Sequence, residues 1–268
     1  MLVELHCHST CSDGALSPVE VAARAAARGV ALFALTDHDT CAGSAAAVVP
    51  GAEVVRAVEI SCDDGAGTVH VLAYDAGGAW DLLEARLADV RIARRNRLTV
   101  MAARLRMRGI VVDVGPLLAR ADGRAVGRPD LARLMVEAGV VGSVKEAFSR
   151  HLYDRGPVDV PHQTLSLVDV LALGRAAGAR MSLAHPHLYG ARAEPLLRRH
   201  RGEGLEGVEA CYGPYDAGER RRWRALAAAL DLVVTGGSDF HAPGDPEPGV
   251  ELSAAEGARL SAWLGRAA

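Results

Sequence analysis

The chain has 268 residues, a formal net charge of -3, 50% apolar residues and only 4% aromatic residues. This length allows one large domain, or a domain with an insertion, whose core consists mostly of alanine, leucine and valine. The charge argues against duplex nucleic acid as a general partner, and no apolar run approaches the roughly 20 residues that span a bilayer. Because the first residues also lack the features of a signal peptide, we expect a cytoplasmic protein with no membrane partner and no evident protein partner.

The opening stretch predicts a strand that carries two histidines. Apolar residues alternate with polar ones from Val3 onward, so His6 and His8 project from the same face. They would be roughly 6.5 Å apart along the strand, a separation that one metal ion can bridge. The turn Ser12-Asp13-Gly14 can fold Asp13 back over the end of this strand. Taken alone, the pair also fits a chance arrangement on a half-exposed strand.

The following segments alternate between helix and strand. Ser17, Pro18 and Glu20 form a capping box with proline in the first turn, which predicts a helix that stops at Gly29. Strands are expected over residues 31–36, 53–60 and 68–74, with a short helix over residues 43–49. Such alternation, with polar residues at the strand ends, is typical of an α/β fold.

The character of the chain changes between residues 79 and 160. A long helix is expected over residues 80–108, followed by shorter helices over residues 115–121, 129–138 and 144–152 with no strand between them. We interpret residues 79–160 as an α-helical insertion that caps the active site of a domain formed by residues 1–78 and 161–268. The many arginines of this insertion indicate mainly a solvated helix face, from which one or two could reach an anionic ligand.

The alternating pattern resumes at Ser166, which is expected to cap a helix ending at Gly178. Strands are predicted over residues 180–184, 205–211 and 231–235, and helices over residues 219–230 and 254–266. Polar motifs follow two of these strands, namely His185-Pro186-His187 and the segment that contains Asp239 and His241.

Potential metal ligands therefore gather at the ends of successive predicted strands, namely His6, His8, His38, Glu59, His185, Asp239 and His241. Two more potential ligands are His70, within its predicted strand, and Asp13, in the first loop. In a β/α barrel the carboxyl ends of the strands form the active face. At three or four protein ligands per ion, with shared carboxylates, nine ligands suit a cluster of two or three divalent ions. The alternative is nine independent surface or core side chains, which their repeated placement makes improbable.

The ordered set of motifs carries a family resemblance along nearly the whole chain. The motifs are His6-Cys7-His8, Ser12-Asp13-Gly14, Thr36-Asp37-His38-Asp39, Glu59-Ile60, His70-Val71-Leu72, Ala184-His185-Pro186 and Gly237-Ser238-Asp239-Phe240-His241. Together they resemble the PHP (polymerase and histidinol phosphatase) family. The resemblance implies a distorted, seven-stranded, TIM-like β/α barrel with a trinuclear site for Mn, Fe or Zn.

The same resemblance implies how the ligands divide among the ions. One ion would be held by His6, His8, Glu59 and Asp239, a second by Glu59, His70 and His185, and a third by Asp13, His38 and His241. Glu59 would then bridge two ions.

The insertion is similar to one branch of this family. Arg95-Asn96-Arg97 and Gly127-Arg128-Pro129 resemble nucleoside 3',5'-bisphosphate phosphatases and 5'-to-3' oligonucleotide exonucleases. Two features depart from that branch. Asp130 stands where histidine is expected, and the segment 211–215 differs from a histidine-containing loop. Both could line the substrate pocket, so they bear on the substrate and not on the metal site.

Several residues are expected to act on the substrate. The proposed catalytic residues are Glu59, Asp239, Arg128 and His187, and the proposed substrate contacts are Arg128, Arg95, Asn96 and Asp39. Arg128 would clamp a phosphate through two hydrogen bonds, and His187 would protonate the leaving oxygen. A surface ion pair is an equally open role for Arg128, as is a surface position for His187. Asp39 and Asp37 could instead orient the histidines.

These features predict a metal-dependent phosphoesterase. Three divalent ions held by three carboxylates keep a net positive charge, which suits a phosphate dianion. The expected reaction converts a nucleoside 3',5'-bisphosphate to the 5'-monophosphate and phosphate, with short 5'-phosphorylated oligonucleotides as further substrates. The alternatives are hydrolysis of a cyclic phosphate diester, of histidinol phosphate or of an amide, and a metal-binding PHP module without catalysis.

Overall fold

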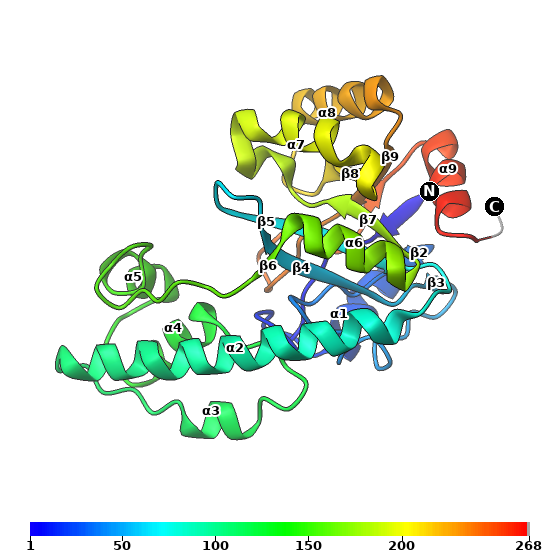
Figure 1. Ribbon diagram of the computed structural model, residues 1–268. Helices are drawn as coiled ribbons and strands as arrows, with labels where there is room; N and C mark the ends of the chain where they lie inside the picture. Colours follow the sequence, from blue (N-terminus) through cyan, green and yellow to red (C-terminus); the bar gives the residue numbers. More distant parts are fainter. Residues whose placement is uncertain (267–268) are drawn as a thin grey trace.

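The computed structural model describes residues 1–266, and the strands in this part of the chain form two sheets (Figure 1). The smaller sheet has the order β10 (Val250–Glu251), β1 (Leu2–Glu4), β2 (Leu32–Phe33) and β3 (Glu53–Val54). The larger sheet has the order β6 (Leu165–Ser166), β4 (Ala57–Asp63), β5 (Thr68–Asp75), β7 (Ala179–Leu183), β8 (Leu205–Tyr212) and β9 (Val233–Gly237). Pairs β1–β2, β2–β3, β7–β8 and β8–β9 are parallel, whereas β4–β5 and β5–β7 are antiparallel. The fold is therefore mixed α/β, as the sequence predicts.

Backbone hydrogen bonds join the two sheets at both of their inner edges. On one side the segment after β1 pairs with the end of β9 and the segment that follows it, through Leu5 N to Gly236 O (3.2 Å), Asp239 N to His6 O (2.7 Å) and His8 N to Phe240 O (2.9 Å). On the other side Asp39 N, after β2, donates to Glu59 O on β4 at 2.8 Å. The segments that carry the predicted ligands are thus fixed side by side.

Five α-helices of the described chain cover the outer faces of the sheets (Figure 1). They are α1 (Pro18–Ala27), α6 (Leu167–Ala177), α7 (Ala193–His200), α8 (Ala217–Leu230) and α9 (Ala254–Trp263). Ser17 and Glu20 form the predicted capping box of α1, and Ser166 caps α6 by accepting the Asp169 N–H. Gly178 ends α6 in the left-handed conformation, with φ 69°.

The remaining α-helices lie together at one side of the molecule (Figure 1). They are α2 (Trp80–Met107), α3 (Gly115–Ala119), α4 (Arg128–Glu137) and α5 (Val144–Arg150). The first half of α2 buries Leu83 and Leu87 in the core of the larger sheet, whereas its second half buries Leu98 and Leu105 in a separate core with α4. Because α2 belongs to both cores, it fastens the helical segment rigidly to the sheets. The division into a barrel and a cap remains a prediction.

Some expected elements differ from those observed. Residues 42–46 form turns and not a helix, so the prediction over residues 43–49 is wrong. The segment is short and contains Gly43, and both its length and a glycine disfavour a helix. The strand expected over residues 53–60 is broken between β3 and β4, where the chain passes from one sheet to the other. Helix α7, the 3₁₀ turns at Pro186–Arg192 and Arg201–Glu203, β6 and β10 lie where no element is predicted.

No helix within residues 1–266 is both long enough and apolar enough to cross a membrane.

Candidate metal centre

The nine predicted ligands converge on one site where the two sheets meet. His6 and His8 follow β1, His38 follows β2, Glu59 lies on β4, His70 on β5, His185 follows β7, and Asp239 and His241 follow β9. Asp13 reaches the site from the loop after His8. These side chains form overlapping groups whose ligand atoms lie within 4.8 Å of one another, namely His8–Asp13–His38–His241, His6–His8–Glu59, His6–His185–Asp239 and His38–Glu59–His70. The nine residues predicted from sequence are therefore neighbours in space.

Glu59 lies at the centre of this cluster and is 1% exposed. Its Oε1 lies 3.0 Å from His70 Nδ1 and 3.0 Å from His185 Nε2. Its Oε2 lies 2.8 Å from His38 Nδ1 and 3.4 Å from His8 Nε2. The two oxygens of one carboxylate thus face different histidines, which is the arrangement that a bridging ligand requires.

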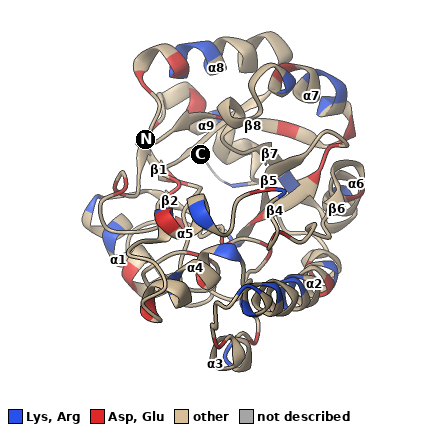
Figure 2. Cartoon of the chain, turned by 90° about the vertical axis from the view of Figure 1, so that its left-hand side faces the viewer, with Lys and Arg blue, Asp and Glu red and all other residues tan. Residues whose placement is uncertain are grey.

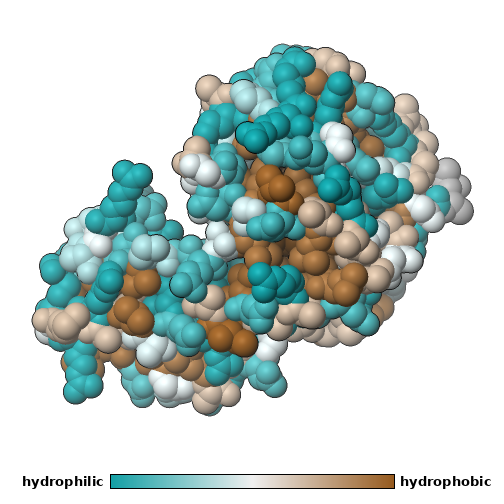
Figure 3. Space-filling model, in the orientation of Figure 1, coloured by the Kyte–Doolittle hydropathy of each residue, from teal (hydrophilic) through white to brown (hydrophobic). Residues whose placement is uncertain are grey.

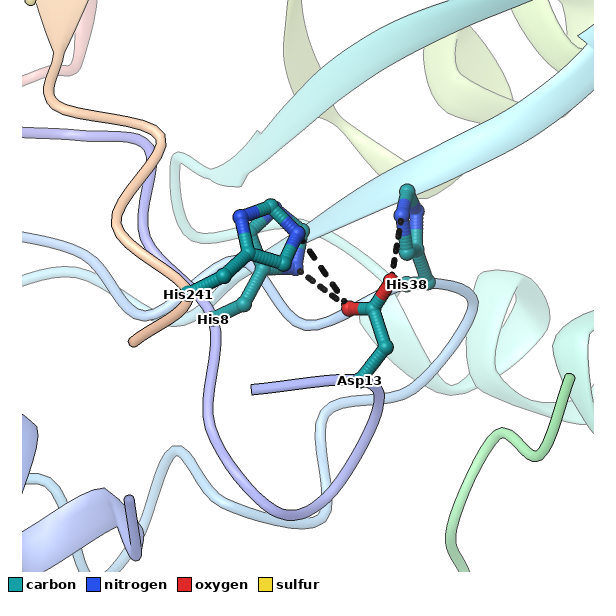
Figure 4. A group of neighbouring side chains, drawn as sticks. All are labelled: His8, Asp13, His38 and His241. Carbon is teal, nitrogen blue, oxygen red and sulfur yellow. Dashed lines mark ion pairs between the residues drawn. The ribbon is translucent and has the colours of Figure 1, made fainter. Parts of the chain in front are cut away.

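Asp13 occupies the other end of the cluster (Figure 4). Its Oδ1 lies 3.4 Å from His241 Nε2 and 3.6 Å from His8 Nδ1, and its Oδ2 lies 3.7 Å from His38 Nε2. The imidazoles of His8 and His241 are stacked with centroids 4.1 Å apart. Three histidines around one carboxylate form a set of N and O ligands that suits a borderline divalent ion.

Several ligand atoms are buried without a hydrogen-bond partner among residues 1–266. They are Nε2 of His6, Nε2 of His8, Nδ1 of His38 and Oε2 of Glu59. Each lies 2.8–3.4 Å from another ligand atom of the cluster, but without hydrogen-bond geometry. Buried polar atoms are costly when unpaired, and here they point at one another. Divalent ions between them would satisfy all four, so the residues present fit a metal cluster.

The charges of the cluster are mutually compensating. Burial alone raises the pKa of Glu59, but the charges of His38, His70 and His6 hold it well below its ordinary value. Burial opposes protonation of His38, yet Glu59 and Asp13 raise its pKa to about 9. Against the same penalty of burial, Asp13 raises the pKa of His241 to about 9. In the protein without ions, protons on histidines therefore balance the buried carboxylates.

Two buried glutamates that were not predicted hold the histidine segment in place. Glu209, on β8, lies 3.0 Å from His6 Nδ1 and accepts the backbone N–H of His185 at 2.7 Å. Glu4 accepts the N–H groups of His6 (3.0 Å), Ser238 (3.1 Å) and Gly249 (2.6 Å), and burial raises its pKa to about 7. Glu4 alternates with His6 and His8 in sequence, and this alternation could have identified it. Glu209 lies within a mostly apolar strand, and no sequence pattern marks it as a partner of His6.

Tyrosine hydroxyls and Asp37 support other ligands. Tyr212 donates to Asp239 Oδ2 at 2.9 Å, which turns Oδ1 of Asp239 toward His6, and Tyr189 lies 3.1 Å from His185 Nδ1. Asp37 accepts the N–H of Ser9 and the hydroxyl of Ser12, so it orders the loop of Asp13 and does not contact a histidine ring.

A cavity of about 650 Å³ opens beside the cluster, between the helical segment and the sheets, where the surface in Figure 3 is hollowed. Asp13, His38, His70 and His185 line its inner end. Five arginines also line it, namely Arg94 and Arg97 of α2, Arg128 of α4, Arg155 and Arg192, together with the carboxylates of Asp154 and Asp159. The blue positions in Figure 2 mark the many arginine residues of α2. The cavity therefore joins a metal centre to a cationic chamber that suits a polyanionic ligand.

Of the four predicted substrate contacts, Arg128 lines the cavity, whereas Arg95, Asn96 and Asp39 do not. Arg128 lines the cavity, where it pairs with Asp154 and lies over the ring of Phe148. Arg95 instead donates to the Leu118 carbonyl at 3.1 Å, and Asn96 is exposed on α2. Their neighbours Arg94 and Arg97 line the cavity in their place.

Neither Asp39 nor His187 lines the cavity. Asp39 is fully buried, with one oxygen bound to Ser61 N (2.9 Å) and the other to Arg94 Nε (2.7 Å), so it positions Arg94. His187 is exposed and bonds through Nδ1 to the Tyr215 hydroxyl at 2.9 Å.

No protein-family model matches the chain. Over 251 residues the chain is 35% identical to the 3',5'-nucleoside bisphosphate phosphatase of Chromobacterium violaceum, which covers 91% of this chain and 88% of that protein. Over 247 residues it is 32% identical to the 5'-3' exoribonuclease of Haemophilus influenzae, which covers 90% of each. A crystal structure from Bifidobacterium adolescentis, assigned as a metal-dependent phosphoesterase, superposes with a TM-score of 0.84 over 98% of both chains at 28% identity.

Proposed function

Because the chain belongs to the PHP family of metal-dependent phosphoesterases, we propose that it hydrolyses nucleoside 3',5'-bisphosphates to nucleoside 5'-monophosphates and phosphate. As an enzyme it is a metal-dependent phosphoric ester hydrolase, like the relatives that it matches over most of their length. Short 5'-phosphorylated oligonucleotides would be secondary substrates, because the net charge of -3 offers no long basic track for a polymer.

The observation that carries this proposal is the chamber of arginines beside the metal cluster. A substrate with one phosphate at the cluster would reach Arg94, Arg97 or Arg128 with a second anionic group elsewhere on the molecule. Arg94 is held by Asp39, and Arg97 by Asp159 and the Val160 carbonyl, so these cations are fixed before substrate binds. A nucleoside bisphosphate carries its two phosphates at a set distance and fits such a pair of sites.

The chain's own side chains supply the rest of the mechanism. Divalent ions at the cluster would lower the pKa of a bound water and neutralise charge on the transferred phosphoryl group. Glu59 and Asp239 hold the ligand histidines in place, and Glu209 keeps the Nδ1 proton on His6 so that its Nε2 faces the cluster. Arg128 would bind a phosphate of the substrate. His187 is the candidate from sequence for protonating the leaving oxygen.

The finer features expected of the family are part of the same proposal. The ligand groups favour two or three ions of Mn, Fe or Zn, with Glu59 as a bridge. The backbone bonds between the sheets support a distorted barrel of seven strands, in which β3 and β4 act as one interrupted strand. Helices α2 to α5 would serve as a fixed cap over the active site.

A panel of phosphate esters tests the proposal. Metal-loaded protein would be assayed with adenosine 3',5'-bisphosphate, 3'-AMP, histidinol phosphate, a cyclic phosphate diester and a short 5'-phosphorylated RNA, with products identified by chromatography. The proposal expects 5'-AMP and phosphate from the bisphosphate, and no turnover after chelation. Preference for the cyclic diester would assign the alternative reaction, and absence of turnover on every ester would indicate a metal-binding module without catalysis.

A further inference from the structure

Asp130 is a buried carboxylate between two arginines, at the face of α4 that meets the metal centre. It is 4% exposed, and its Oδ2 accepts the N–H of Gly127 at 2.9 Å. Its Oδ1 lies 3.5 Å from Arg124 Nη2 and 3.4 Å from Arg133 Nη1. A buried carboxylate retains its charge only with such partners, so this one holds two guanidinium groups in fixed positions.

Both arginines reach the loop that presents the ligand Asp13. Arg133 Nη2 donates to the carbonyl oxygen of Asp13, and Arg124 Nη2 donates to that of Ser12 at 3.5 Å. Beside them, the N–H of Ala125 donates to the Cys11 carbonyl at 3.0 Å. The helical segment thus binds three successive carbonyls of one loop, although more than 100 residues separate the partners in sequence.

We propose that Asp130 is a positioning residue for Asp13, acting through Arg124 and Arg133, so that the ion bound by the Asp13 group depends on α4. The inference rests on the metal centre of the proposed function. It follows from geometry, because Asp13 stands alone on its loop, 3.4–3.7 Å from its three histidines, and a displacement of about 1 Å is enough to weaken a metal site. The ions at Glu59 have ligands on β4, β5 and the segments after β1, β7 and β9, and do not need this support.

The proposed role of residue 130 therefore requires a negative charge. A histidine, which the family resemblance leads one to expect here, would bring no fixed negative charge to hold two arginines. Asp130→Asn keeps the size of the side chain and an oxygen for the Gly127 N–H, but removes the charge. Arg133→Gln is a second variant, at a side chain that is 37% exposed and whose loss leaves the core of the helical segment intact. Glu137→Gln, an exposed carboxylate at the end of the same helix, is the matched control.

Mn²⁺ binding to the full-length protein by equilibrium dialysis tests the inference. Asp130→Asn and Arg133→Gln are expected to weaken one ion by about 10- to 100-fold and to leave the others at wild-type affinity. Glu137→Gln should bind all ions like the wild type. In an Asp13→Asn background, which lacks the ligand itself, Asp130→Asn should have no additional effect on metal binding.

Two results would overturn the inference alone. The first is that Asp130→Asn and Arg133→Gln both bind every ion with wild-type affinity. The second is that they weaken all ions equally and that Asp130→Asn still does so in the Asp13→Asn background. If Asp13→Asn itself bound as many ions as the wild type, no ion would depend on Asp13. That result would overturn the proposed third metal site together with the inference.

Discussion

The carboxylate of Glu209 lies 3.0 Å from Nδ1 of His6, and both side chains are fully buried. The contact fixes the proton on Nδ1 and leaves Nε2 as the proposed ligand atom. Glu209→Gln keeps the shape but removes the charge, so we expect metal affinity to fall by about 10- to 100-fold. Competition with a chelator measures this metal affinity. Glu206→Gln, on the same strand but outside the cluster, is the control, and equal affinities in the two variants would contradict this role.

Glu59→Gln should be the most damaging single change at the cluster. If Glu59 bridges two ions, the substitution removes charge from both and should lower kcat on the order of 10³-fold. Steady-state kinetics should be measured at metal saturation, with the ion content determined by elemental analysis. Near-normal turnover in a metal-replete variant would show that Glu59 is not a bridge.

Arg128→Ala should affect the substrate and not the ions. Loss of a charge-assisted contact to phosphate should lower kcat/KM for the bisphosphate by roughly 10- to 1,000-fold while the ion content is unchanged. Arg86→Ala, on the exposed first part of α2, controls for loss of positive charge. If Arg128→Ala lost ions, Arg128 would belong to the metal centre instead.

Without ions, the stability of the protein should decline as pH rises from 6.5 to 8.5. Glu59 and Asp13, acting against burial, raise the pKa of His38 to about 9, and Asp13 does the same for His241, from ordinary values of 6.5. A raised pKa adds stability that is complete below the unfolded value and is lost as pH rises through the folded one.

Thermal melting of chelated protein across this range provides the measurement. A variant with His38→Asn and His241→Asn should show a shallower decline, and the metal-loaded protein should be nearly insensitive, because ions replace the protons. A melting temperature of the chelated wild type that is constant or rises over this interval would refute the charge balance described for the cluster.

The location of most of the candidate ligands could be predicted because His6, His8, His38, His185, Asp239 and His241 follow strands, whereas Glu59 and His70 lie within strands and Asp13 in a loop. The segments after β1, β2, β7 and β9 meet where the two sheets join, which is why a position after a predicted strand was informative for His6, His38 and His185. The lengths of the strands could not be predicted, since pairing across the sheets decides where they end. β1 stops at Glu4, and His6 lies beyond it.

The substrate side was harder to predict because arginines occur all round α2. The resemblance proposed Arg95 and Asn96, but sequence alone does not set the rotation of such a helix, and in the structure Arg94 and Arg97 line the cavity. Contacts such as Arg133 with Asp13, or Glu209 with His6, join residues far apart in the chain and leave no local pattern.

The central claim is that this metal centre acts on a molecule with two phosphates. The most direct test is kcat/KM for adenosine 3',5'-bisphosphate against 3'-AMP, with metal-loaded wild type and Arg128→Ala compared in parallel. We expect the wild type to favour the bisphosphate by at least about tenfold, ~1.4 kcal/mol, and the variant to lose most of this preference. Equal values for the two substrates in the wild type would contradict the account.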